Sequence, residues 1–193
     1  MIETSQVTKL RTLTGSGIVD CKKALEESNG NFDAAVDYLR KRGQKIAANK
    51  EGRATHEGIV YAYVHTNGRV GTIVEISCET DFVARNEQFK QFAHEIALQI
   101  TATNPLYIRP EDVPQEVIEK EKEIYLEQLP ADKPEQIREK ILAGKLDKYF
   151  QEVCLLKQQS IKDEDSTIEH LLTDVIAKMG ENIQVKRFCR FSL

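Results

Sequence analysis

The sequence lacks the motifs that mark most nucleotide-binding and metal-dependent enzymes. It contains no G-x-x-x-x-G-K-[ST] phosphate loop and no G-x-G-x-x-G motif, so we expect this chain to bind no nucleotide itself. It has no H-E-x-x-H pair, and its 4 histidines are scattered, so no metal site is predicted. A catalytic triad assembled in space stays open, but no residue can be assigned to one. We therefore expect no cofactor and no enzymatic activity.

Signals for membranes, secretion and disulfides are also missing. No apolar run approaches the roughly 20 residues of a membrane span, and the opening MIETSQVTKLR has no apolar core of a signal peptide. The four cysteines, Cys21, Cys78, Cys154 and Cys189, are far apart and form no C-x-x-C pair, which is typical of reduced thiols. A cytoplasmic protein without a membrane partner is predicted.

The charge of the chain is of the wrong sign for a protein that binds mainly to phosphate backbones. Its net charge is −4, so no direct nucleic-acid partner is expected, although Lys45, Lys50 and Arg53 form a local basic stretch. With 193 residues, 40% hydrophobic and 30% charged, the chain has the composition of an ordinary globular protein of one or two domains.

Residues 1–45 show the apolar spacing of three short helices, a small domain of their own. Asn31 is a plausible cap for the third helix and Gly43 its stop, and the polar residues 46–57 are interpreted as a helix tail and linker. The three apolar stripes are Val7, Leu10 and Leu13; Ile18, Cys21, Ala24 and Leu25; and Phe32, Ala35, Val36 and Leu39.

Residues 58–109 form the predicted α+β core. Two β-rich runs, GIVYAYVH and VGTIVEISC, flank Asn67-Gly68, a pair that favours a type I′ hairpin turn. Apolar residues then follow helical spacing from Phe89 to Ile100, which indicates a core-facing helix.

The remainder of the chain adds a helical hairpin and returns to the core. In residues 110–148, Pro114 and Pro134 each open a charged helix with a thin apolar stripe, and LPADK joins the two. Such stripes predict two antiparallel helices that pack mainly on each other and project as a coiled coil. Residues 149–193 complete the core with a helix ending at Gly180 and a strand, NIQVKRFCRFSL, that pairs with the hairpin into an antiparallel sheet. The predicted fold class is α+β.

A phenylalanine lies in the connection between the hairpin and the core helix. Residues 77–89 read SCETDFVARNEQF, and Phe82 directly follows an acid. Connections run over the surface, so this aromatic side chain either folds back under the hairpin or is available to a partner.

Four stretches of the sequence resemble the elongation factor Ts family, the guanine-nucleotide exchange factors of elongation factor Tu. They occur in the family's order and cover almost the whole chain. They are LRTLTGSGIVDCKKALEESNG (10–30), EISCETDFVARNEQF (75–89), RPEDVP (109–114) and MGENIQVKRF (179–188).

The resemblance implies a fold and an assembly. It implies a ubiquitin-associated (UBA)-like three-helix module, a linker, an α+β core and a protruding helical hairpin. Because the hairpin is rich in Glu and Lys, we interpret it as a solvated protrusion and assign it no role in exchange. The chain is similar to short members with one core subdomain: residues 63–69 resemble the second core copy of longer members, and TDFV resembles the first. A homodimer could restore the full contact surface, which implies a 2:2 complex with elongation factor Tu.

The resemblance also implies which residues act. Thr80, Asp81, Phe82 and Val83 would dislocate the Mg²⁺ of the partner, with Asp81 and Phe82 entering its nucleotide domain. Thr80 would cap or orient the turn, and Val83 would pack inward. This reading favours an outward Phe82.

Four more residues match partner-contacting positions of the family: Ile18, Val19, Lys22 and His65. Each of two has a structural alternative, because Ile18 also lies on an apolar stripe and His65 could be an ordinary strand residue beside a turn.

Other functions are consistent with the same sequence. A UBA-like binding module without exchange activity would not need TDFV. A ribosome-associated factor would use Lys45, Lys50 and Arg53, and its binding would weaken steeply with salt. An enzyme remains a third alternative, without an assignable site.

Overall fold

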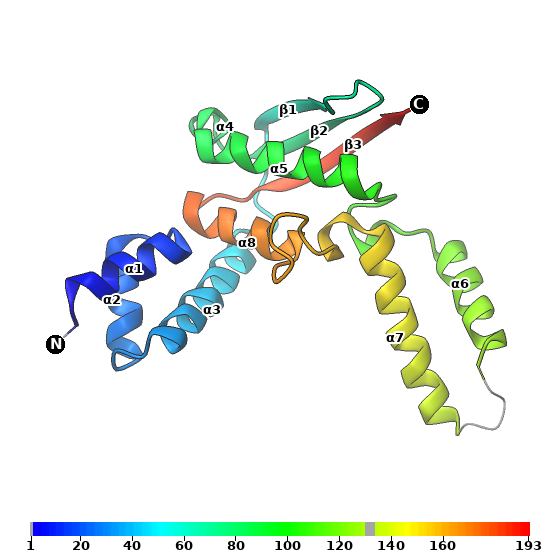
Figure 1. Cartoon of the computed structure of the whole chain (residues 1–193), viewed down its shortest axis with the longest axis horizontal. Coiled ribbons are helices and arrows are strands. Elements are labelled where there is room, and N and C mark those ends of the chain that lie inside the picture. Colours follow the sequence, from blue (N-terminus) through cyan, green and yellow to red (C-terminus); the bar gives the residue numbers. More distant parts are fainter. Residues whose placement is uncertain (1, 130–133) are drawn as a thin grey trace. The chain divides into compact units, whose positions relative to one another are not determined.

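The computed structural model describes residues 2–129 and 134–193, which form helices and one three-stranded sheet (Figure 1). This confirms the α+β class. Contacts divide the chain into two compact units: Met1–Ile59, Ile76–Phe92 and His170–Gln184 form unit 1, and Val60–Glu75, Ala93–Glu169 and Val185–Leu193 form unit 2. The five domain ranges expected from the sequence stay predictions.

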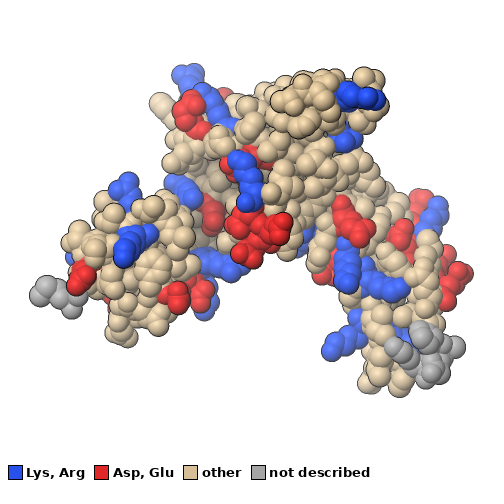
Figure 2. Space-filling view, in the orientation of Figure 1, with Lys and Arg blue, Asp and Glu red and all other residues tan. Residues whose placement is uncertain are grey.

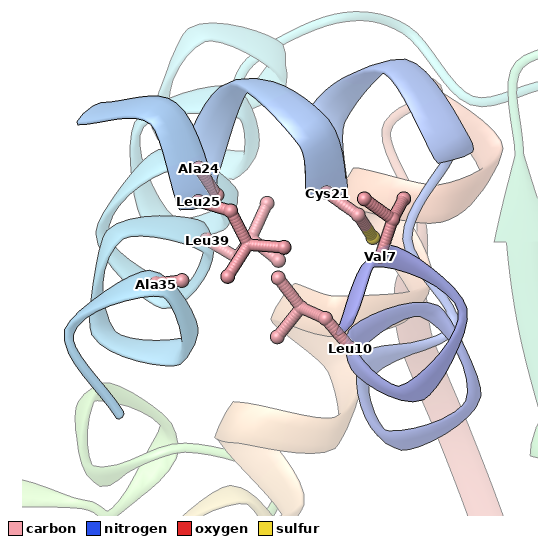
Figure 3. Close-up of a cluster of buried hydrophobic side chains, with 7 residues drawn as sticks. All are labelled: Val7, Leu10, Cys21, Ala24, Leu25, Ala35 and Leu39. Carbon is pink, nitrogen blue, oxygen red and sulfur yellow. The ribbon is translucent and has the colours of Figure 1, made fainter. Parts of the chain in front are cut away.

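Unit 1 begins with three helices, as the apolar spacing predicted: α1 (Thr4–Thr14), α2 (Ile18–Glu27) and α3 (Phe32–Lys50). Asn31 is the predicted cap, since its side chain accepts a hydrogen bond from the Ala34 N–H at 3.1 Å. The likeness to UBA modules stays a prediction. The three helices enclose a core of buried side chains (Figure 3), namely Val7, Leu10, Cys21, Ala24, Leu25, Ala35 and Leu39.

Three expectations for this part were wrong. Helix α3 does not stop at Gly43 but continues to Lys50. Gly43 is buried inside α3 without a positive φ, and a Cβ atom there would lie 3.5 Å from the Ala177 Cβ, an ordinary van der Waals distance, so this glycine neither ends the helix nor is required for its packing. Leu13 and Ile18 are 66% and 56% exposed, because they flank the connection between α1 and α2, beyond the end of the small core.

Strands β1 (Glu57–Val64), β2 (Val70–Cys78) and β3 (Gln184–Ser192) form one sheet in the order β1-β2-β3. The hairpin and its pairing with the last strand are confirmed. The type I′ turn is wrong: the Gly68 N–H donates to the His65 carbonyl at 2.8 Å, and in this turn only Gly68 has a positive φ, 66°. Asn67 instead accepts the Arg69 N–H with its side chain at 2.9 Å, which holds the loop without a left-handed asparagine.

Helices α4 (Asp81–Arg85), α5 (Glu87–Thr103) and α8 (Ile168–Met179) complete the core elements, together with the short 3-10 turns η1 (Pro110–Asp112) and η2 (Leu155–Lys157). Gly180, with φ 71°, ends α8 as predicted. The predicted apolar face of α5 is buried and consists of Phe89, Phe92, Ala93, Ile96, Ala97 and Ile100.

Helices α6 (Gln115–Glu127) and α7 (Glu135–Val153) pack side by side in unit 2. The Lys145 ammonium lies 5.0 Å from the Tyr125 ring centroid and donates to the Gln128 side chain at 2.8 Å. Charges of both signs mix along the pair (Figure 2). Helix α7 runs beyond the expected limit at 148, and the predicted LPADK connection falls largely on 130–133, outside the described residues. Over the described chain, no helix has the length and apolar character to cross a bilayer.

Candidate functional site

The segment from Thr80 to Val83 is the start of a helix rather than an irregular connection. Strand β2 ends at Cys78, and α4 begins at Asp81 with Thr80 as its N-cap in an extended conformation. The Thr80 hydroxyl oxygen accepts the Val83 N–H at 3.5 Å, which satisfies one of the N–H groups that a helix start leaves unpaired. This cap sets the direction in which the short helix α4 begins.

Phe82 points into solvent. Its side chain is 82% exposed, whereas Ala84 on the same helix is buried and Val83 is half-buried. The alternative in which Phe82 folds under the hairpin is therefore wrong. Burying such a side chain against another protein is worth roughly 2–3 kcal/mol, so an isolated exposed phenylalanine is a strong potential anchor.

Asp81, beside Phe82, already has a partner within its own helix. The Arg85 guanidinium lies 3.0 Å from the Asp81 carboxylate; the Arg85 side chain is largely exposed and the Asp81 side chain partly so. Exposed pairs at this spacing contribute well under about 1 kcal/mol, so Asp81 can change partners at little cost.

Beneath α4 lies a polar network that joins three distant parts of unit 1. One Glu181 carboxylate oxygen accepts the N–H groups of Glu79 and Thr80 at 3.1 and 3.0 Å, and the other accepts the Thr80 hydroxyl at 2.6 Å. In return the Glu79 carboxylate accepts the Asn182 N–H at 2.6 Å and lies 3.5 Å from Arg53. The Asn182 side chain donates to the Arg53 carbonyl at 2.7 Å. These bonds fix the chain directly before α4 begins.

Glu79 and Cys78 respond differently to this environment. The hydrogen bond from the Asn182 N–H, aided by the Arg53 charge, lowers the pKa of the Glu79 carboxyl, so it is ionised at neutral pH. Burial raises the pKa of the Cys78 thiol to about 11. This thiol stays protonated, lies 3.2 Å from the Thr80 carbonyl oxygen as a donor, and is a structural group rather than a nucleophile.

The sequence analysis did not assign Glu181 and Asn182 to the site. They lie about 100 residues from Glu79 and Thr80 along the chain, and neither charge nor spacing links the two stretches. The one available signal was that both pairs lie in motifs shared with the elongation factor Ts family, the ETDF and MGEN stretches.

A second candidate contact surface lies at the start of α2. Val19 is 79% exposed and its neighbour Ile18 is exposed as well, so the core alternative for Ile18 is wrong. Lys22, one turn on, forms only a distant 3.9 Å pair with Glu26. Leu13, which the sequence analysis placed in the core, adds a further exposed apolar side chain of unit 1.

His65 lies in unit 2 and is exposed at the end of β1. Its Nδ1 shares a 3.1 Å hydrogen bond with the Tyr63 hydroxyl. The other predicted site residues all belong to unit 1. Its role in partner binding stays a prediction.

One face of the sheet in unit 2 is covered by α5. The Thr101 hydroxyl of α5 hydrogen-bonds the Thr72 hydroxyl at 2.9 Å, and His94 of α5 lies within hydrogen-bonding distance of Tyr61, 3.2 Å. Successive side chains of a strand point to opposite faces. Ile73, next to Thr72, therefore belongs to the other face.

That other face carries apolar side chains that the described residues leave exposed. The Arg187 guanidinium donates to Glu75 at 2.6 Å on this face, which fixes the register of β3 and places Cys189 there by alternation. Cys189 is exposed. Alternation along the three strands places four exposed large apolar residues on this open sheet face: Val60, Val64, Ile73 and Phe191.

No group of three or more His, Cys, Asp or Glu residues in the described part of the chain could hold a metal ion. The site offers instead two exposed apolar contacts, Phe82 and the Ile18–Val19 pair, on a rigid polar and apolar support. Such an arrangement can bind a protein surface.

Comparison with known proteins gives a consistent match. Residues 15–193 match the family model described as Elongation factor TS. The chain is 56% identical to Elongation factor Ts of Thermotoga petrophila, over 97% of this chain and 94% of that protein. It is 54% identical to the protein of the same name from Carboxydothermus hydrogenoformans, over 100% and 89%, and 50% identical to that from Syntrophus aciditrophicus, over 100% and 96%.

Proposed function

Because this chain belongs to the elongation factor Ts family, we propose that it is a cytoplasmic guanine-nucleotide exchange factor for elongation factor Tu and has no enzymatic chemistry of its own. The observation that carries the proposal is the outward Phe82 on the capped helix α4. An exposed side chain held in a fixed direction can enter the nucleotide domain of a partner as a wedge.

Thermodynamic linkage states what the wedge must do. A protein that binds nucleotide-free elongation factor Tu more tightly than the GDP-bound form weakens GDP binding by the same factor. GDP in a GTPase is held by the phosphate loop and by Mg²⁺ bridging to the phosphates. Burial of Phe82 beside the Mg²⁺ site would stabilise the displaced state by roughly 2–3 kcal/mol, about two powers of ten in affinity.

The neighbours of Phe82 have distinct roles in this mechanism. Thr80 caps α4 and sets its direction, and half-buried Val83 holds the helix against unit 1. Asp81 leaves its exposed pair with Arg85 and anchors the edge of the wedge through a polar contact.

The start of α2 supplies a second grip on the same partner. Ile18 and Val19 offer exposed apolar area on a firmly packed helix, and Lys22 offers a cation with only a weak internal pair. His65, in unit 2, is proposed to contact the partner as the equivalent of the second core copy of longer members.

We propose that the chain forms a homodimer through the open sheet face of unit 2, giving a 2:2 complex. This face presents four exposed large apolar residues, Val60, Val64, Ile73 and Phe191, and one subunit would supply TDFV while the other supplies the second core surface. Analytical ultracentrifugation of wild type and Phe191→Asp tests this: a dimer that dissociates in the variant is expected, and a monomeric wild type would refute it. A non-reducing gel shows whether Cys189 links the subunits.

Release of fluorescent GDP from elongation factor Tu tests the exchange function. Wild-type protein should accelerate release in a saturable manner. Binding without acceleration would favour a UBA-like binding module, and salt-sensitive binding to ribosomes alone would favour the basic stretch at Lys45, Lys50 and Arg53. Either result would refute the proposal.

A further inference from the structure

We infer that Glu181 is a positioning residue for nucleotide exchange: its carboxylate fixes the start of α4 and thereby the direction of Phe82. The inference rests on the proposed function and adds to it a residue about 100 positions away in the sequence. It stands on three hydrogen bonds that one carboxylate accepts, none longer than 3.1 Å.

Helix α4 requires outside support. It has five residues, Asp81–Arg85, and a single helical turn is not stable by itself in water. The N–H groups at its start have no partner within the helix. Glu181 supplies acceptors to the Glu79 and Thr80 N–H groups just before the helix begins.

The bond to the Thr80 hydroxyl couples Glu181 to the cap itself. A hydroxyl group has one proton, and the 2.6 Å distance to the Glu181 carboxylate assigns that proton to this bond. A lone pair of the Thr80 oxygen then faces the Val83 N–H, the capping bond of α4. Glu181 thus orients the cap as well as the backbone that precedes it.

The position of Glu181 is fixed by its own neighbour. The Asn182 N–H donates to Glu79, and the Asn182 side chain donates to the Arg53 carbonyl. The stretches around Glu79 and around Glu181 therefore bind each other reciprocally. A carboxylate held in this way keeps its acceptors in place without the help of a partner protein.

Phe82 depends on this support because its own side chain receives almost none. With so little of the ring packed against unit 1, its direction follows from the α4 backbone. A wedge that is already oriented loses less conformational freedom on binding than one that must be ordered. Loss of Glu181 should therefore reduce exchange through Phe82 and not through the α2 contact.

The test compares Glu181→Ala with Glu164→Ala, which removes an exposed glutamate in unit 2. We expect Glu181→Ala to lower the maximal GDP release rate about tenfold while the half-saturating concentration changes less than about twofold. Glu164→Ala should match wild type. A Glu181→Ala protein with the wild-type maximal rate would overturn the inference, whereas a wild type without exchange activity would overturn the proposed function.

A double-mutant cycle shows whether Glu181 acts through Phe82. If it does, Glu181→Ala should cause little further loss when Phe82→Ala is already present. Losses that multiply would mean that Glu181 acts by another route, and would contradict the inference.

The Thr80 pair tests the same coupling with a smaller change. Thr80→Val removes the hydroxyl, and Thr80→Ser keeps it. We expect Thr80→Val to lower the maximal rate about threefold and to speed hydrogen exchange at the Val83 and Ala84 amides, and Thr80→Ser to restore both. If Glu181→Ala does not fold, equal rates for Thr80→Val and Thr80→Ser would still overturn the inference.

Discussion

Helices α2 and α4 both expose apolar side chains, but they are supported in different ways. Helix α2 has ten residues, and its inner face contributes Cys21, Ala24 and Leu25 to the core of the three-helix module. Helix α4 has five residues, buries Ala84 as its one fully buried side chain, and is held mainly by hydrogen bonds at its start.

This difference teaches how each surface can serve a partner. An apolar core tolerates small changes around its edge, so the α2 surface suits general affinity. Hydrogen bonds are directional and fail when one partner is lost, so the α4 support suits a side chain that must enter a defined place. We therefore expect α2 to contribute affinity for the partner and α4 to promote GDP release.

Removing a core side chain should have the largest effect on stability. Leu25→Ala deletes most of a fully buried side chain and should lower the free energy of unfolding by about 2–5 kcal/mol. Leu13→Ala, at an exposed position, should change it by less than about 0.5 kcal/mol. Urea unfolding followed by circular dichroism measures the stability of both variants. Equal midpoints for the two would contradict the view that the buried apolar core supports α2.

A substitution at the exposed α2 surface should weaken binding to elongation factor Tu without lowering the maximal rate of GDP release. Val19→Ser removes about 1.5 kcal/mol of apolar burial on binding, so the half-saturating concentration in the GDP release assay should rise about tenfold. The maximal rate should stay at the wild-type value. Lys23→Ser, on the same helix, is the control. A fall in the maximal rate with Val19→Ser would mean that the α2 surface contributes to exchange as well as to affinity.

The smallest expected effect is an acid dependence of the α4 support. The pKa of Glu79 is lower in the folded protein than its ordinary value of 4.5, first because its carboxylate accepts the Asn182 N–H. Its stabilisation is therefore complete above that value and is lost as the pH falls through the lowered pKa. Glu79→Gln should flatten the fall in unfolding free energy between pH 6 and pH 3, in the range set by this shift. Identical acid profiles for wild type and variant would contradict this reading of the network.

The sequence predicted what depends on local spacing. Helical periodicity located the three N-terminal helices and α5, because their apolar residues recur every three or four positions. The Asn-Gly turn between two β-rich runs located the hairpin. It failed where the tertiary context decides. Glycine often follows the end of a helix, yet Gly43 lies buried inside α3, which continues to Lys50.

The candidate site divides in the same way. Phe82 could be singled out because an aromatic residue is unusual in the segment between β2 and α5. In the structure this segment contains the short helix α4, on which Phe82 is exposed. Glu181 and Asn182 could not, because their contacts with Thr80 and Glu79 cross about 100 residues and depend on how β3 and α8 meet β2. Polar networks between distant segments leave no periodic pattern in a sequence.

The most direct test of the account is the maximal rate of GDP release from elongation factor Tu with wild-type protein and with Phe82→Ala. Because Phe82 is exposed, the variant should unfold at the wild-type urea midpoint. The account predicts a loss of about a hundredfold in the maximal rate, from roughly 2–3 kcal/mol of lost burial. A Phe82→Ala protein that releases GDP as fast as wild type would contradict the wedge mechanism.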